Sequence, residues 1–456
     1  MDEHQAMKIL LISANTLKAP YPVYPIGLDH VAASIHGRHR VRIEDLNVLD
    51  GLTGLTVNIH EFEPDLIGIS LRNIDNTDTT DPVGFIDGYR TVMDAVRQVS
   101  PAPVVLGGSG FTLFPRRVLA ELGADFGIVG EGERLNRLID ALETGKDPTG
   151  LPGVILPDGK SILFPAPWTG DRKPRPKHPA AHLSWYLKHG AMLNLQTKRG
   201  CPFRCIYCTY PLIEGRRLRL VAPIEAARTA LALEAAGARY LYITDSSFNA
   251  DINHSLDVAR AFKKAGLTIP WGAFFTPLNL PDGYFETLVE AGLKHVEFGT
   301  DTLSDVMLRT YGKPFTIEQV FAAHEAALGA GCHVAHYFLL GGPGETNQTL
   351  DDTLIHIDRL RQTILFFFCG MRVYPQTPLF RQCAEKRRFD AGTDLLEPLF
   401  YQSAKIDADT IRQRVAEKAA GRVNWVVGAG GEATAATLDR MYKKGFSGPL
   451  WEYLIR

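Results

Sequence analysis

The chain has 456 residues, a formal net charge of −2 and 45% hydrophobic content, which is enough for a large core divided over two or three domains. The near-neutral charge gives no reason to expect nucleic acid or an anionic membrane as the main partner. The first residues, "MDEHQAMKILLISA", do not match a signal peptide, and "TILFFFCGM" is too short to span a bilayer. Six cysteines in so long a chain do not make a disulfide scaffold, so we expect a cytoplasmic protein without a membrane span.

Short apolar runs alternate with helical patterns from residue 8 to about residue 142. Helices such as "GLDHVAASIHG" separate the expected strands, which are "KILLIS", "VRIEDLN", "DLIGISL", "PVVLGGSG" and "FGIVGEGE". This alternation predicts a doubly wound, Rossmann-like α/β domain over residues 1–145.

Residues 146–190 contain eight prolines and little periodicity, which is typical of a linker. A second βα series follows over residues 191–378, with expected strands "MLNLQTK", "RYLYITDS", "IPWGAFF", "HVEFGTD", "HVAHYFLLGG" and "ILFFFCGMRVYP". These units predict a partial (β/α)6 barrel, whose chemistry belongs at the carboxyl ends of the strands. The remaining residues, 379–456, are irregular and helical and predict a small C-terminal cap or substrate domain.

Half of the cysteines lie in "KRGCPFRCIYC", directly after the first expected barrel strand: Cys201, Cys205 and Cys208. Thiolates are soft ligands that suit zinc or an iron–sulfur cluster. A structural zinc site wants four protein ligands, and no further histidine or cysteine lies close in sequence. Three cysteines on a 4Fe–4S cluster would leave one iron open for a substrate or cofactor. We favour the cluster, with a zinc knuckle or a chance grouping as the alternatives.

This segment resembles the CxxxCxxC signature of the radical S-adenosylmethionine (SAM) enzymes, including the aromatic residue before the last cysteine. Further matching segments follow in the family's order: "YITDSSF", "EFGTDT", "LLGGPGET" and "YPQTPL". The resemblance implies a 4Fe–4S cluster on the three cysteines and SAM contacts from Tyr207, Asp245, Asp301, Gly341, Gly342, Pro343 and Gly344. Asp301 replaces the family's glutamate and could equally hold a buried arginine. The glycines could simply turn the chain, and we expect Cys332, Cys369 and Cys383 to be core residues.

The first domain lacks a GxGxxG turn after its first strand, which argues against a dinucleotide. Its glycines lie in "GGSGF" and "GIVGEGE", after the fourth and fifth strands. This layout resembles the cobalamin-binding domain that precedes the barrel in one large class of radical SAM enzymes. The resemblance implies cobalamin contacts from Arg72, Gly107, Gly108, Ser109, Gly130, Glu131 and Gly132.

The usual cobalt-ligating histidine motif, DxHxxG, is missing, since Asp29 and His30 are adjacent. Arg72, in the loop "SLRNIDNTD", is our candidate for the residue that faces the lower side of cobalt, where a guanidinium cannot act as a ligand. Two alternatives stay open: Arg72 pairs with Asp75 or Asp78 on the loop, or the domain no longer binds cobalamin.

The resemblance implies an enzyme that methylates an unactivated carbon of a small-molecule or natural-product intermediate. One SAM would yield a 5′-deoxyadenosyl radical with an electron from an external flavodoxin- or ferredoxin-type donor, and methylcobalamin would supply the methyl group. The substrate would enter between the two domains, with the C-terminal helices as a lid. The alternatives are a non-methylating radical SAM enzyme (a cyclase, a ring-contracting enzyme or an aminocarboxypropyl transferase), a polar C- or P-methyltransferase, and a non-catalytic cobalamin or cluster sensor.

Overall fold

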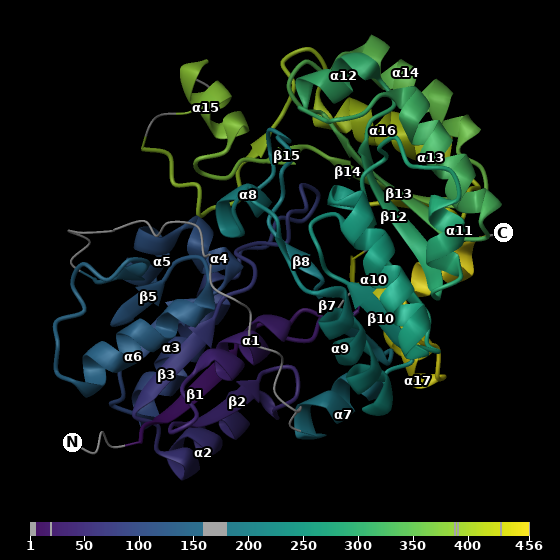
Figure 1. The fold of residues 1–456 in the computed structure, drawn as a ribbon. Helices are drawn as coiled ribbons and strands as arrows, with labels where there is room; N and C mark the ends of the chain where they lie inside the picture. Colours follow the sequence, from purple (N-terminus) through teal and green to yellow (C-terminus); the bar gives the residue numbers. More distant parts are fainter. Residues whose placement is uncertain are drawn as a thin grey trace.

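The computed structural model shows an N-terminal α/β domain beside a larger barrel-like domain (Figure 1). It describes residues 6–18, 21–157, 180–386, 389, 392–428 and 431–455. Within these ranges no helix combines the length and the apolar character needed to cross a membrane.

The first domain contains a six-stranded sheet in the order β2-β1-β3-β4-β5-β6. Its strands are β1 (Lys8–Ser13), β2 (Arg40–Asp45), β3 (Leu66–Ser70), β4 (Val104–Gly107), β5 (Phe126–Ile128) and β6 (Val154–Ile155). Its helices are α1 (Ile26–Ser34), α2 (Gly51–Phe62), α3 (Ile86–Val99), α4 (Ser109–Leu113), α5 (Pro115–Leu122) and α6 (Leu135–Glu143), with a 3-10 turn, η1 (Gly132–Arg134). The five predicted strands are confirmed and parallel. The central residues of β1, β3 and β4 are buried on both faces, because helices cover the sheet on both sides, whereas the edge strand β2 is only partly buried.

Part of the predicted linker, residues 146–190, folds as elements of the two domains. β6 pairs antiparallel with β5, and α7 (Ala180–Lys188) leads into the barrel. Residues 158–179 of the predicted linker lie outside the described residues.

The second domain is a seven-stranded, all-parallel sheet in the order β17-β14-β13-β12-β11-β10-β7, curved into an open barrel (Figure 1). Its strands are β7 (Met192–Leu195), β10 (Tyr240–Ile243), β11 (Trp271–Phe275), β12 (Leu293–Asp301), β13 (His333–Leu340), β14 (Thr363–Cys369) and β17 (Trp425–Val427). Two further pairs of short strands are antiparallel: β8 (Lys198–Arg199) with β9 (Arg219–Leu220), and β15 (Met371–Arg372) with β16 (Phe400–Tyr401). The six predicted barrel strands are confirmed, whereas β17 comes from the region that we expected to be helical.

Helices accompany the barrel strands, as the second βα series predicts. They are α8 (Tyr210–Ile213), α9 (Pro223–Ala235), α10 (Ile252–Ala265), α11 (Tyr284–Val289), α12 (Asp305–Thr310), α13 (Ile317–Gly329) and α14 (Asn347–His356), with 3-10 turns η2 (Phe248–Ala250) and η3 (Ile357–Arg359). Alternate strand residues such as Phe275, Phe298 and Phe338 point outward into this helical layer and are almost fully buried.

The C-terminal region contributes to both ends of the barrel. α15 (Pro378–Glu385) lies at the carboxyl ends of the strands, where Leu379 N donates to Ile206 O at 2.9 Å. α16 (Ala408–Ala419) packs beside β14 and β17. α17 (Gly431–Lys443) and the 3-10 turn η4 (Leu450–Leu454) close the opposite, amino end (Figure 1). The single C-terminal cap that we expected is therefore divided between two ends.

Candidate active site

The three clustered cysteines lie on the loop that joins β8 to β9, between the two domains (Figure 1). Cys201 N donates to Gly215 O at 3.0 Å, which ties the start of this loop to its end. Gly200 has a φ of 95°, and a Cβ there would lie 2.2 Å from Arg217 O, so only glycine fits this turn. We call residues 200–218 the cluster loop.

The cysteine set fits an iron–sulfur cluster better than a single metal ion. Among the described residues, no three His, Cys, Asp or Glu side chains converge as the ligands of one metal ion would. In a cubane the cysteines bind different irons, so they do not need to converge on one point. The other three cysteines, Cys332, Cys369 and Cys383, are buried in three separate hydrophobic clusters, as expected for core residues.

Tyr207 and Asp301 meet a third residue, Lys313, beside the cluster loop. The Tyr207 hydroxyl donates to Asp301 Oδ2 at 2.5 Å, and Lys313 Nζ lies 2.8 Å from the same oxygen. Asp301 thus holds a buried cation, as the alternative interpretation proposed, although that cation is a lysine. Its φ of 63° is uncommon for a residue other than glycine and indicates local backbone strain. We did not predict Lys313 as a site residue from the sequence. A local signal for it was present in the segment "GKP", which follows the helix after this strand.

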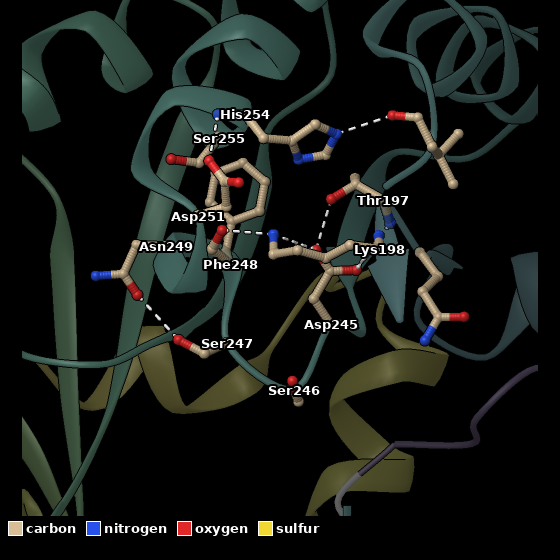
Figure 2. A network of polar contacts seen from close by, with 12 residues as sticks. Thr197, Lys198, Asp245, Ser246, Ser247, Phe248, Asn249, Asp251, His254 and Ser255 are labelled. Carbon is tan, nitrogen blue, oxygen red and sulfur yellow. Dashed lines mark hydrogen bonds and ion pairs between the residues drawn. The ribbon is translucent and has the colours of Figure 1, made fainter. Parts of the chain in front are cut away.

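Asp245, in the loop after β10, is part of a buried network that reaches β8, the strand that leads to the cluster loop (Figure 2). Its oxygens accept hydrogen bonds from Thr197 N at 2.7 Å, Thr197 Oγ1 at 2.5 Å and Lys198 N at 3.1 Å. Lys198 Nζ lies 2.9 Å from Asp245 Oδ2 and also donates to Phe248 O. Both side chains of this ion pair are 1% exposed or less. Asp245 therefore fixes β8 through internal contacts, and its direct contact with SAM stays a prediction.

The same network continues toward α10. Ser247 Oγ donates to Asn249 Oδ1, and Asp251 accepts from His254 N as the N-cap of α10 (Figure 2). These bonds satisfy the buried polar groups of the loop after β10, which holds that loop in one conformation.

The glycine-rich segment after β13 is locked by protein contacts. Glu345 is fully buried and accepts from Gly341 N at 3.2 Å and Thr349 Oγ1 at 2.6 Å. A Cβ on Gly342 would lie 2.6 Å from the Tyr311 hydroxyl, and Gly344 has a φ of 91°. Two of these glycines are thus required by packing and backbone conformation. The SAM contacts of Gly341, Gly342, Pro343 and Gly344 stay predictions.

Gln376 belongs to the "YPQTPL" segment, which resembles a radical SAM motif that has glycine at this position, and it adopts a φ of 64°. This value explains why a glycine is favoured at the position. The chain tolerates glutamine there at the cost of backbone strain.

Arg72 lies exposed on the loop after β3, and it forms no ion pair with any described residue. Asp75, one of the two partners considered for it, instead pairs with Arg372 of the barrel at 2.7 Å. Ser109 Oγ donates to Arg72 O at 2.7 Å, which joins the loops after β3 and β4. Thr79 Oγ1 donates to Cys369 O at 2.5 Å, so the same loop also contacts the barrel.

The glycines proposed for cobalamin binding differ in their surroundings. Gly108 has a φ of 100°, and a Cβ there would lie 2.6 Å from Leu71 O. Gly130 has a φ of 77° and faces open space, whereas a Cβ on Gly132 would lie 2.4 Å from Val31 Cγ2. Gly107 ends β4 and is half-buried. Gly130 is thus accessible to a ligand, and Gly132 is needed for packing against α1.

Glu131 joins the two domains. Its carboxylate, 5% exposed, pairs with Arg199 and with Arg219, which lies 2.5 Å away. These arginines form the base of the cluster loop, on β8 and β9. Glu214 Oε2 accepts from Gly200 N at 3.0 Å, and Glu214 Oε1 lies 3.3 Å from Arg199 Nε, which extends the network to the residue before Cys201. We call this network the interdomain clamp; a cobalamin contact of Glu131 stays a prediction.

Comparison with known families agrees with this geometry. Residues 12–139 match the B12 binding domain, and residues 195–357 match the Radical SAM superfamily. The chain is a radical SAM enzyme with a B12-binding domain.

Two relatives of this radical SAM enzyme align over most of both chains. An uncharacterised methyltransferase of Pyrococcus horikoshii is 27% identical over 81% of this chain and 83% of its own length. The tryptophan 2-C-methyltransferase of Streptomyces laurentii is 25% identical over 83% of this chain and 74% of its own length.

The solved structure of the radical SAM methyltransferase TsrM from Kitasatospora setae, with cobalamin and a 4Fe–4S cluster bound, has the same fold. Its TM-score is 0.86 at 21% identity, and the match covers 98% of this chain and 97% of that one. The two-domain architecture is therefore shared along nearly the whole chain.

Proposed function

We propose that this enzyme is a cobalamin-dependent radical SAM methyltransferase that methylates an unactivated carbon of a small-molecule substrate. The observation that carries the proposal is the interdomain clamp. Glu131, in the loop expected at cobalamin, is bonded directly to the base of the cluster loop. A methyl donor on one domain and a radical generator on the other need such a fixed relation, because they act on the same carbon.

In this proposal Cys201, Cys205 and Cys208 hold the 4Fe–4S cluster. When bound, the cluster and cobalamin supply reductive SAM cleavage and methyl transfer. Lys313, held by Asp301 at 2.8 Å, offers a cation beside the cluster loop to the carboxylate of SAM. An external flavodoxin- or ferredoxin-type donor would supply the electrons.

The remaining roles concern cobalamin and the substrate. Gly130 leaves open space on the first domain, and the exposed Arg72 offers a cation that cannot ligate cobalt. The substrate would lie between the two domains. A carbon acceptor is supported by the tryptophan 2-C-methyltransferase relative.

The test measures the fate of SAM in anaerobic, reduced holoenzyme without added substrate, with SAM labelled in its methyl group. We expect 5′-deoxyadenosine from radical cleavage and one equivalent of S-adenosylhomocysteine per bound cobalamin, with the label on cobalamin. The Cys208→Ala variant should lose the deoxyadenosine. S-adenosylhomocysteine without deoxyadenosine, with substrate present as well, would indicate polar methylation. Methylthioadenosine as the main product would indicate aminocarboxypropyl transfer and contradict methylation altogether.

A further inference from the structure

The inner face of the barrel carries aromatic side chains that are more exposed than their outward-facing neighbours. Phe275 and Phe367 point outward and are 2% and 0% exposed. Phe274, Phe366 and Phe368 alternate with them on the inner face and are only half-buried. In closed (β/α)8 barrels, layers of side chains fill this interior. Partial exposure of large inner rings therefore indicates an interior that side chains do not fill.

These inner rings form one continuous wall. Tyr337 of β13 stacks on Phe366 of β14, with ring centroids 4.7 Å apart and planes 14° apart, and it is nearly parallel to Phe368. Phe274 of β11 reaches Tyr337 at 5.3 Å across the intervening β12, which requires the concave face of the sheet. We call Phe274, Tyr337, Phe366 and Phe368 the aromatic wall.

Open space connects this wall to the reactive end of the barrel. Gly299 lies on β12 between Glu297 and Asp301 and is half-buried. A Cβ built on Gly299 would meet only Lys313 Nζ, at 3.9 Å. No other atom of the described residues lies within 4 Å of that Cβ, so the inner face of β12 is open here, toward the Asp301–Lys313 pair beside the cluster loop.

The C-terminal segment closes the other side of this space. Glu297 accepts hydrogen bonds from the Tyr242 hydroxyl at 2.9 Å and from Trp451 Nε1 at 3.0 Å. Tyr21, from the first domain, approaches Tyr242 with ring centroids 6.0 Å apart. The space thus has a polar floor, an aromatic wall and one side supplied by the B12-binding domain.

We propose that this space is the substrate chamber and that it takes a flat aromatic or heteroaromatic ring, stacked on the aromatic wall. Aromatic rings prefer offset-stacked or edge-to-face partners, and the parallel Tyr337 and Phe366 rings present such a face. A saturated ring of equal size buries a similar apolar area but gains no stacking. This proposal deepens the proposed function by naming the substrate class, but ring binding itself does not depend on methyl transfer.

The test compares two probes by calorimetry on the anaerobic holoenzyme: indole, which is flat, and octahydroindole, its saturated counterpart. We expect indole to bind about 5- to 10-fold more tightly. The Phe368→Leu variant keeps an apolar side chain and removes the ring face. It should remove most of this preference while leaving octahydroindole binding unchanged. Phe446→Leu is the matched control, because Phe446 is a surface ring, 36% exposed, on the C-terminal segment.

Iron, cobalamin and SAM-derived products are measured on the same samples. If these are normal but indole and octahydroindole bind equally, or neither binds, the chamber proposal is overturned and the proposed function stands. An unchanged indole preference in Phe368→Leu also overturns it. If indole binds with the expected preference while SAM yields neither deoxyadenosine nor S-adenosylhomocysteine, the proposed function fails and the chamber remains.

Discussion

The two ends of the barrel both contain buried charged groups, but they use them differently. At the carboxyl end the ion pairs Lys198–Asp245 and Lys313–Asp301 fix segments that lead to or flank the cluster loop. At the amino end Glu452 bonds to Tyr240, His295 and His333, which lie at or near the start of three different strands. Burying a charge is costly unless all its partners are present. The same device therefore orients a reactive loop at one end and seals the barrel at the other.

Positive φ values occur at both ends of the barrel. Ala191 and Gln362, directly before β7 and β14 at the amino end, have φ values of 51° and 50°. Asp301, Gly341, Gly344 and Gln376, all near the carboxyl ends of the strands, have positive φ values. Strained or rare conformations persist only where surrounding contacts hold them, and they concentrate at functional sites. Positive φ values alone therefore do not distinguish the two ends, and the following experiments test how each end uses its buried charged groups.

The largest effect is expected from the cluster ligands. Protein purified without oxygen should be brown and contain about four irons per chain, as one cubane would. Replacing Cys201, Cys205 or Cys208 with alanine should remove the iron and the absorbance. Cys332→Ala, at a buried cysteine in the core, is the control and should keep both. Tightly bound zinc without iron in the anaerobic wild type would contradict the cluster.

Breaking the buried Lys198–Asp245 ion pair, which fixes the strand before the cluster loop, should strongly destabilise the fold. Asp245→Ala leaves the Lys198 ammonium buried without its counter-charge, at a cost of about 3–5 kcal/mol in the free energy of unfolding. The matched control is Asp257→Ala, which removes an exposed partner of Arg260 and should cost less than about 0.5 kcal/mol. Chemical denaturation measures the free energy of unfolding of both variants. Equal losses would mean that the buried Asp245 contributes no more to stability than the exposed Asp257.

The stability that the Glu452 contacts give to the amino end of the barrel should be lost at acidic pH. Burial raises the pKa of the Glu452 carboxyl, but hydrogen bonds from His295, His333 and Tyr240 outweigh it and lower the pKa to about 2. The Glu452 carboxyl therefore binds its proton more tightly in the unfolded chain than in the folded one. Its contribution to the free energy of unfolding is present above pH 4.5 and is lost as the pH falls toward 2. It amounts to at most about 3 kcal/mol. The thermal unfolding temperature (Tm) of Glu452→Gln should therefore fall less steeply with decreasing pH over this range than that of the wild type. Identical slopes would argue against a stabilising role of the Glu452 contacts.

The smallest effect on stability is expected at Arg72. The specific readout there is the visible spectrum of bound cobalamin. Its side chain is exposed, so Arg72→Ala should leave unfolding within about 0.5 kcal/mol of the wild type. If Arg72 faces cobalt, Arg72→His should introduce a nitrogen ligand and change the visible spectrum of bound cobalamin, with iron content unchanged. Spectra that match the wild type in both variants would return Arg72 to a surface-loop role.

Local patterns in the sequence were sufficient to predict most of the strands and to propose the ligand set. Runs such as "KILLIS" and "HVAHYFLL" predict buried strands because an apolar run of that length needs cover on both faces. The spacing of Cys201, Cys205 and Cys208 predicts a soft-ligand site, and all three lie on one loop of the structure. These features involve residues a few positions apart, so periodicity and spacing are enough to find them.

The tertiary structure decided which partners each site residue meets. Asp301 is bonded to Tyr207, 94 positions away in the chain, and Trp451 donates to Glu297 across 154 positions. The sequence does not indicate that β17 completes the barrel sheet, that Glu131 clamps the cluster loop, or that the inner rings are left half-exposed. Each of these depends on burial and geometry that exist only when distant segments pack together, because an ion pair or a ring stack gains its energy from its surroundings as much as from its residue types.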